Sequence, residues 1–185
     1  MVLIDTKVPN FVFIFSRKLM IEVKIQKVIS YPFETVLGQY FDYEHIEFVH
    51  PRSLGTYYLL EDNGDKIIYE HVWPRKGLIG KSSIVEHQYF PPNEMWFIFT
   101  KGRYKGVKVH TKLFAQQEET LVDETYYTPL PNWKWLKTLV GKYTRLEVER
   151  VWQEDLDVEV CHGGWPGIPE SYWKYKENGQ IPENL

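Results

Sequence analysis

The chain has 185 residues, which is the size of one domain with a substantial hydrophobic core. Its formal net charge of -3 disfavours nucleic acid as a partner, because attraction to a phosphate backbone requires a basic surface. The single cysteine, Cys161, excludes an intrachain disulfide and is typical of a cytoplasmic protein.

Residues 1–20 are predicted to be an extension that precedes the folded domain. Their apolar run, residues 11–15, is far shorter than the roughly 20 residues of a membrane-spanning helix, so we expect no membrane span. Arg17 and Lys18 follow directly, where a signal peptide would have a small-residue cleavage site. Either Met1 or Met20 can be the true start.

Residues 21–29 alternate between apolar and polar side chains, which predicts a half-buried strand. Pro32 and an apolar repeat at helical spacing predict one or two short helices within residues 32–50. Pro51 ends them, because the residue before a proline is disfavoured in helical geometry. Turn signals then separate runs rich in β-branched and aromatic residues. These runs predict an antiparallel meander with strands at residues 55–62, 65–73, 82–90, 95–101, 106–116 and 119–128.

After Pro131 the pattern changes to that of one long helix of about seven turns, which ends at Gly163 and Gly164. The apolar side chains that repeat along it are expected to form its buried stripe: Leu136, Val140, Tyr143, Leu146, Val148, Val151 and Val158. Residues 163–185 keep several aromatic side chains, so we expect an extended arm that packs on the body or on a neighbouring subunit of a homo-oligomer.

This order of elements over residues 21–162 resembles the START-like and Bet v 1-like (SRPBCC) superfamily. The resemblance implies an α+β helix-grip fold, in which a curved antiparallel sheet wraps around the C-terminal helix and a pocket for a hydrophobic small molecule lies between them. The side chains expected to line this pocket are Tyr69, His71, Trp73, Phe97, Phe99, His110 and Val151. A histidine on a strand is more often a core residue than a ligand, and that alternative stays open for His71, His87 and His110.

The segment that follows the predicted short helices has the spacing Asp42-x-x-His45-x-x-x-x-His50. It resembles the mononuclear iron motif in the catalytic domain of Rieske-type non-heme iron aromatic-ring-hydroxylating oxygenases. The resemblance implies that His45 and His50 bind Fe(II). Asp42 is the further catalytic candidate and is expected to orient His45, because a metal-bound histidine commonly donates its other N–H to a carboxylate.

A third ligand is expected on the long helix, because a facial triad needs one carboxylate beside two imidazoles. Asp155 lies among valines on the predicted buried face, where an unpaired carboxylate would be costly. Asp157 shares its face with polar residues, so Asp155 is the preferred ligand. Without a metal, the partner of a buried Asp155 would be Arg145, Arg150 or a histidine.

The motif leads to the hypothesis of an oxidoreductase: a non-heme Fe(II) oxygenase-like enzyme that acts on a hydrophobic or aromatic small molecule. A Rieske cluster needs two cysteines, which this chain lacks, so a separate ferredoxin or reductase would supply electrons. A basic hairpin, Lys101, Arg103, Lys105 and Lys108, is its candidate docking site, although a solvated hairpin edge is the simpler interpretation. Two alternatives stay open: a metal-free START-like lipid-binding, polyketide-binding or cyclase protein, and a structural zinc site.

Overall fold

The computed structural model describes residues 20–43, 46, 49, 50, 53–63, 66–73 and 82–162, except the side chains of residues 157–162. Most of the expected N-terminal extension and the whole aromatic arm lie outside these residues. The elements are β1 (Ile21–Ile29), α1 (Phe33–Gln39), β2 (Thr56–Asp62), β3 (Lys66–Val72), β4 (Ser82–Phe90), β5 (Glu94–Gly102), β6 (Lys108–Gln116), β7 (Glu119–Thr128) and α3 (Lys134–His162). Each observed strand lies within two residues of its predicted limits.

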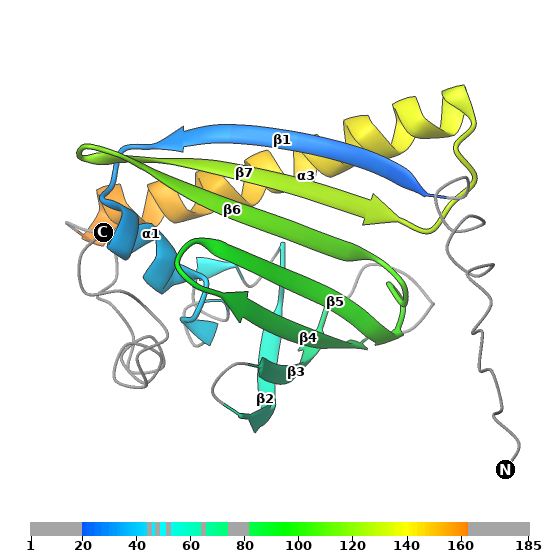
Figure 1. The fold of residues 1–185 in the computed structure, drawn as a ribbon, viewed down its shortest axis with the longest axis horizontal. Helices are drawn as coiled ribbons and strands as arrows, with labels where there is room; N and C mark the ends of the chain where they lie inside the picture. Colours follow the sequence, from blue (N-terminus) through cyan, green and yellow to red (C-terminus); the bar gives the residue numbers. More distant parts are fainter. Residues whose placement is uncertain are drawn as a thin grey trace, which may run out of the picture.

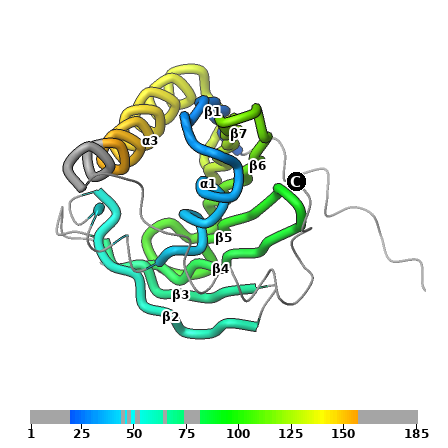
Figure 2. Tube along the Cα trace, turned by 90° about the vertical axis from the view of Figure 1, so that its left-hand side faces the viewer, coloured from blue at the N-terminus to red at the C-terminus, as the bar shows by residue number. Residues whose placement is uncertain are grey.

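The strands form one antiparallel sheet in the order β1-β7-β6-β5-β4-β3-β2. Strands β2 to β7 follow one another as a meander, and β1 joins its far edge by pairing with β7. Figure 1 shows the long helix α3 passing behind β1 and β7, and α1 at one end of the sheet. Figure 2 shows the sheet curving from β1 to β2 with α1 on its concave side. The predicted helix-grip fold is confirmed.

The alternation of side chains along the strands decides what faces the centre of the fold. Strand β1 buries Ile21, Val23 and Ile25 and exposes the residues between them. Strand β4 buries Ser83, Val85, His87 and Tyr89 in the same way. Because these strands bury one face and leave the other towards solvent, a slip of one residue would turn the buried side chains outward, so the register is strongly specified.

Helix α3 packs against β1 along one side only. Its buried Val148 and the partly buried Leu136 and Val140 join a cluster with three side chains of β1. Tyr143 and Leu146, which were predicted to belong to the buried stripe, are 63% and 54% exposed. This correction follows from helix geometry, since at 100° per residue Leu146 points about 160° away from Val148. In the described part of the chain, no helix is both long enough and apolar enough to cross a membrane.

The end of β5 requires a glycine. Gly102 has a φ of 84°, in the left-handed region. A Cβ atom at this position would lie 2.1 Å from the carbonyl oxygen of Ser82 on the neighbouring strand. Both constraints, the backbone angle and the close approach of two strands, exclude a side chain here.

Candidate functional site

A cavity of about 500 Å³ lies between the sheet, α1 and α3. Most of its wall consists of aromatic and aliphatic side chains. Those that the sequence had placed there are Tyr69, His71, Trp73, Phe97, Phe99 and Val151. Asp42, His50 and Asp155 of the predicted metal site also contribute to the wall. The cavity therefore has an apolar wall with a small number of polar groups.

His110 is the predicted pocket residue that the structure places elsewhere. Its ring stacks on Trp96 at 4.2 Å, and its Nε2 lies 2.7 Å from a carboxylate oxygen of Glu94. On β6 the neighbouring Val109 and Thr111 are the inward side chains, so the alternation of the strand turns His110 to the outer face. The expectation that His110 lines the pocket is corrected.

His50 is the centre of a polar group on one side of the cavity, which we call the His50 group. Its side chain is 1% exposed. Its Nδ1 lies 2.9 Å from Glu154 Oε2, and its Nε2 lies 2.9 Å from Asp155 Oδ1. The hydroxyl of Ser53 donates a hydrogen bond to the same oxygen of Glu154. Two consecutive carboxylates of α3 thus hold one imidazole.

The His50 group explains how a carboxylate is tolerated on the inner side of α3. Burial lowers the pKa of His50, but the hydrogen bonds and charges of Asp155 and Glu154 outweigh burial and leave its pKa raised above 6.5. A protonated His50 can therefore neutralise part of the acidic charge. The sequence had left open that Asp155 meets a histidine, and the structure shows this contact.

The structure brings together part of the predicted metal site. His50 and Asp155 are in contact, whereas His45 lies outside the described residues. Asp42 lies in the wall of the cavity, and its predicted contact with His45 falls outside the described part. Within the residues that the structure describes, no group of three His, Cys, Asp or Glu side chains is arranged to hold a metal ion.

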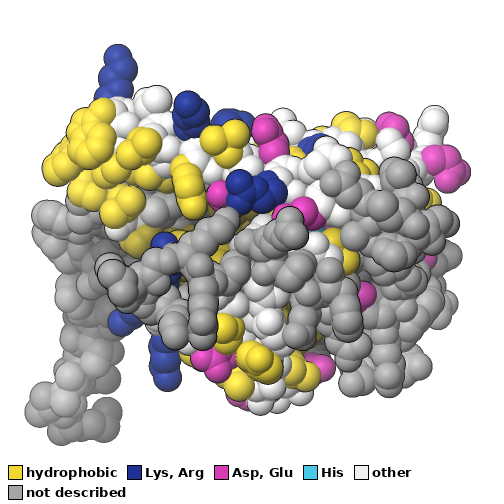
Figure 3. Space-filling model, turned by 180° about the vertical axis from the view of Figure 1, so that it is seen from behind, with side chains coloured by type: hydrophobic (Ala, Val, Ile, Leu, Met, Phe, Trp, Pro, Cys, Tyr) yellow, Lys and Arg dark blue, Asp and Glu magenta, His cyan; other side chains and the backbone are white. Residues whose placement is uncertain are grey.

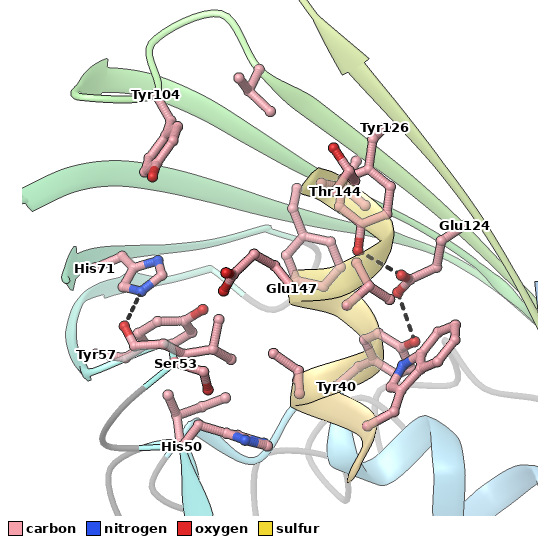
Figure 4. A pocket seen from close by; sticks show the side chains of 18 of the residues that line it. Tyr40, His50, Ser53, Tyr57, His71, Tyr104, Glu124, Tyr126, Thr144 and Glu147 are labelled. Atoms are coloured by element: carbon pink, nitrogen blue, oxygen red, sulfur yellow. Dashed lines mark hydrogen bonds between the residues drawn. The ribbon is translucent and has the colours of Figure 1, made fainter. Parts of the chain in front are cut away.

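A second polar group, which the sequence analysis did not identify, surrounds Glu124 of β7. This carboxyl is 5% exposed. It accepts hydrogen bonds from the hydroxyls of Tyr126 at 2.6 Å, Tyr40 at 3.0 Å and Thr111 at 3.5 Å. Figure 4 shows Glu124, Tyr40 and Tyr126 together on one side of the cavity, apart from His50, Ser53 and His71. We call this set the Glu124 group.

Burial shifts the pKa values of the Glu124 group. Burial raises the pKa of Glu124 above 4.5, although the three hydroxyl donors act in the opposite direction. Burial and the charge of Glu124 raise the pKa of Tyr40 and of Tyr126 well above 10, so both phenols keep their protons and act as donors. A signal was present in the sequence, since Glu124 lies at period-two spacing between Val122 and Tyr126 and so shares their inward face of β7.

His71 and Trp73 of the cavity wall add polar atoms without partners among the described residues. His71 Nε2 donates to the carbonyl oxygen of Leu54 at 2.5 Å. Burial lowers the pKa of His71 to about 3, so the ring is neutral and its Nδ1 is an acceptor. His71 Nδ1 and Trp73 Nε1 are both buried and have no hydrogen-bond partner in the part of the chain that is described.

The chain is similar to solved structures but matches no known protein by sequence. No family model matches the chain, and no curated protein matches its sequence. Solved structures with the same fold include the protein TTHA0849 from Thermus thermophilus, with a TM-score of 0.59 and 20% identity over 72% of this chain and 92% of that one. Norcoclaurine synthase from Thalictrum flavum matches with a TM-score of 0.58 and 10% identity over 86% of this chain and 98% of that one.

A third similar structure is the Zhui aromatase/cyclase from Streptomyces sp. R1128, with a TM-score of 0.56 and 14% identity over 78% of this chain and 99% of that one. A START superfamily protein from Mycobacterium smegmatis also matches, with a TM-score of 0.54 and 13% identity. At these identities the matches establish the fold alone, which is the START-like and Bet v 1-like fold.

Proposed function

We propose that the protein binds a hydrophobic small molecule with aromatic character in the cavity between the sheet and α3. The observation that carries this proposal is the cavity itself. Its volume of about 500 Å³ falls within the 300–1,000 Å³ that is typical of small-molecule sites. Its rings, among them Tyr57, Tyr69 and Phe97, offer stacking and edge contacts to an aromatic ligand.

The charges in the wall favour a neutral ligand over an anionic one. Asp42, Glu124, Glu147 and Asp155 all line the cavity. Beside His50, Arg103 is the cationic side chain of the described wall, and its guanidinium lies over the Tyr104 ring at 5.3 Å. A fatty acid or other carboxylate would be repelled by the excess of acidic groups. A ligand hydroxyl or carbonyl can instead bond to the Glu124 group.

The similar structures support this proposal without deciding the reaction. Norcoclaurine synthase and the Zhui aromatase/cyclase are enzymes by name, whereas the protein from Mycobacterium smegmatis is named only as a member of the START superfamily. One fold therefore carries several functions, and the site must decide between them. The Glu124 group would allow proton transfer to or from a bound ligand, as a cyclase requires.

The proposal is tested with the neutral apolar fluorophore N-phenyl-1-naphthylamine, whose emission rises in an apolar site. Val151 lines the cavity from α3, so the variant Val151→Trp fills part of the cavity and is expected to weaken binding at least about tenfold. Val28 on β1 is 45% exposed and outside the cavity wall. Val28→Trp is the matched control and should bind the probe like the wild type.

Mass spectrometry of an organic extract of the purified protein identifies any ligand that it carries from the cell. Equal binding by the wild type and a folded Val151→Trp variant would contradict the proposal, because the probe would then bind elsewhere. Loss of binding in Val151→Trp alone would support it.

A second candidate function, which we infer from one contact, is a mononuclear Fe(II) site. His50 Nε2 and Asp155 Oδ1 lie 2.9 Å apart. Two ligands at a right angle on a divalent ion with bonds of about 2.1 Å have nearly this separation. Glu154 at Nδ1 corresponds to the carboxylate that commonly orients a metal-bound histidine. His50 and Asp155 fit two ligands and Glu154 one supporting group, and we propose His45, which the motif predicts, as the third ligand.

Bound Fe(II) with open positions would supply oxygen activation, and a separate ferredoxin or reductase would then be the electron donor. Elemental analysis of protein purified without chelators, from cells grown with added iron, tests the site. Near-stoichiometric iron in the wild type, lost in folded His50→Ala and Asp155→Ala variants, would support it. A wild type that contains zinc would contradict it in favour of the structural zinc site, and a wild type that stays free of iron after reconstitution would leave the metal-free protein.

A further inference from the structure

The carboxyl of Glu124 lies in the wall of the cavity and is surrounded by neutral donors. Glu124 is 5% exposed and lines the cavity from β7. The three hydrogen bonds that it accepts come from hydroxyl groups: Tyr40 at the end of α1, Thr111 on β6 and Tyr126 on β7. One helix and two strands therefore hold this carboxyl in place without supplying a positive charge.

Two other carboxylates of the cavity wall each contact a basic side chain. Asp155 Oδ1 lies 2.9 Å from His50 Nε2, and Glu147 Oε2 lies 3.4 Å from Arg150. Figure 3 shows that acidic and basic side chains are also intermixed on the outer face of the molecule that contains α3. Among the described residues, no lysine, arginine or histidine forms such a pair with Glu124. Its charge therefore has no counterion in the described part of the protein.

The environment of Glu124 favours a positive charge on the ligand. A buried carboxylate is normally paired, because an unpaired charge away from water is costly. Burial raises the pKa of Glu124 above 4.5 and so opposes its ionisation, whereas a cationic ligand group beside it would favour the ionised form. Because folding has already taken this carboxyl out of water, a ligand cation gains the attraction without a further desolvation of Glu124.

The hydrogen bonds of Glu124 do not use all of its acceptor capacity. Oε1 accepts from Tyr40 at 3.0 Å and Thr111 at 3.5 Å, and Oε2 accepts from Tyr126 at 2.6 Å. An ionised carboxylate has about four acceptor positions, and the hydroxyl oxygens of the two tyrosines have lone pairs of their own. Glu124, Tyr40 and Tyr126 all line the cavity, and Figure 4 shows them together. The three N–H donors of a primary ammonium group can thus meet three acceptors in one place.

The aromatic rings around this carboxyl suit an organic cation. Tyr126 and Trp152 belong to one hydrophobic cluster, and the ring of Tyr40 lies 6.1 Å from that of Phe97. All four side chains line the cavity. The face of an aromatic ring attracts a cation, as the ammonium of Lys27 shows at 5.0 Å from the Trp152 ring. Rings and carboxylate together can offset the loss of water around a bound ammonium group.

We propose that the cavity binds an amine, with its apolar body among the aromatic rings and its protonated nitrogen at the Glu124 group. This inference rests on the proposed binding of a hydrophobic small molecule and names the chemical class of that molecule. The acidic wall agrees with it, since Asp42, Glu147 and Asp155 add to a negative potential that attracts cations and repels carboxylates.

The test compares two probes of one shape, 1-naphthylmethylamine and 1-naphthalenemethanol, by isothermal titration calorimetry of the full-length protein at neutral pH. The amine is protonated at this pH and the alcohol is neutral. The wild type is expected to bind the amine at least about tenfold more tightly, because hydrogen bonds between charged groups are roughly twice as strong as neutral ones. Glu124→Gln keeps the size of the side chain and an acceptor oxygen but removes the charge. It is expected to lower the affinity for the amine at least about tenfold and to change that for the alcohol by less than about twofold.

The matched control is Glu94→Gln, the same substitution on the outer face of the sheet. Glu94 contacts His110 and Lys112 and does not line the cavity. This variant should bind both probes like the wild type. Circular dichroism verifies that both variants are folded.

Each result of this comparison decides the inference. Selective loss of amine binding in Glu124→Gln would support it. Equal affinity of the wild type for amine and alcohol would overturn it and leave the proposed binding of a neutral hydrophobic molecule in place. Unchanged amine binding by Glu124→Gln, or equal losses for amine and alcohol, would overturn it as well. Absence of binding of the amine, the alcohol and N-phenyl-1-naphthylamine would overturn both proposals together.

Discussion

The buried His87 provides a quantitative test of how much stability the protein loses when a histidine in its core must stay uncharged. It is 1% exposed on β4, and its ring stacks on Phe97 at 4.4 Å. Its Nδ1 lies 2.7 Å from the hydroxyl of Tyr43, whereas its Nε2 has no partner among the described residues. Burial lowers the pKa of His87 to about 3. The folded protein therefore holds this imidazole neutral at pH values well above 3.

The sign of the effect follows from comparing the folded and unfolded states. In the unfolded chain His87 has a pKa near 6.5, so below that pH the unfolded state binds a proton at His87 and the folded state does not. Stability then falls as the pH falls from 6.5 towards 3. The loss is about 1.4 kcal/mol for each pH unit, or roughly 3 kcal/mol over two units. The variant His87→Phe keeps an aromatic ring and has no such loss.

Urea unfolding of the wild type and His87→Phe is measured one unit above pH 6.5 and at steps down to two units below it. At the highest pH the variant is expected to be less stable, because Tyr43 loses its partner and the fit of the ring changes. Its disadvantage should shrink by about 1.4 kcal/mol per pH unit below 6.5. Val85→Ala, a buried substitution on the same strand, is the control with a pH-independent difference. A constant difference for His87→Phe would refute the reasoning.

Two further predictions concern stability. Glu124→Gln should gain stability relative to the wild type as the pH rises above 4.5, because the raised pKa of the buried carboxyl makes its ionisation in the folded state costly. Urea unfolding at a series of pH values checks this, and a variant that loses stability relative to the wild type as the pH rises would contradict it. Gly102→Ala should cost about 3 kcal/mol or more and lower Tm, since its Cβ would meet the Ser82 carbonyl. Gly141 on α3 is the comparison, because a Cβ there would lie 3.9 Å from a methyl group of Val23, so Gly141→Ala should raise stability by up to about 1 kcal/mol. Equal changes in stability for Gly102→Ala and Gly141→Ala would refute the requirement for glycine at position 102.

The cavity predictions also separate the two candidate functions. Val151→Trp is expected to remove binding of the apolar probe, whereas iron content depends on His50 and Asp155. A protein that binds the probe and contains no iron would be a binder alone. A protein that contains iron and loses it in the Asp155→Ala variant would have a metal centre beside the cavity.

Sequence patterns were sufficient for the elements of this fold. The period-two alternation and the turn residues located the strands, because most strands have one face in the core and most neighbouring strands of the meander are joined by short connections. The order of the elements indicated a helix-grip fold, which the structure confirms. The helical period also placed Asp155 on the inner side of α3, where it meets His50.

Other features depended on the tertiary structure. His110 faces outward because the register of β6 decides which alternate residues point inward, and a strand with mixed polar and apolar residues on both faces does not reveal this. Tyr143 and Leu146 stay exposed because α3 contacts the sheet along a narrow side, although their apolar character suggested a wider buried stripe.

The His50 group and the Glu124 group show most clearly what depends on the tertiary structure. Glu124 accepts a hydrogen bond from the hydroxyl of Tyr40, which lies 84 residues away in the sequence. His50 contacts the carboxylate of Glu154, which lies 104 residues away. Local sequence specifies that these side chains lie on a strand, a helix or a turn, because short-range sterics and hydrogen bonds fix those elements. Only the curvature of the sheet around α3 brings them together, and their charges and pKa values follow from that contact.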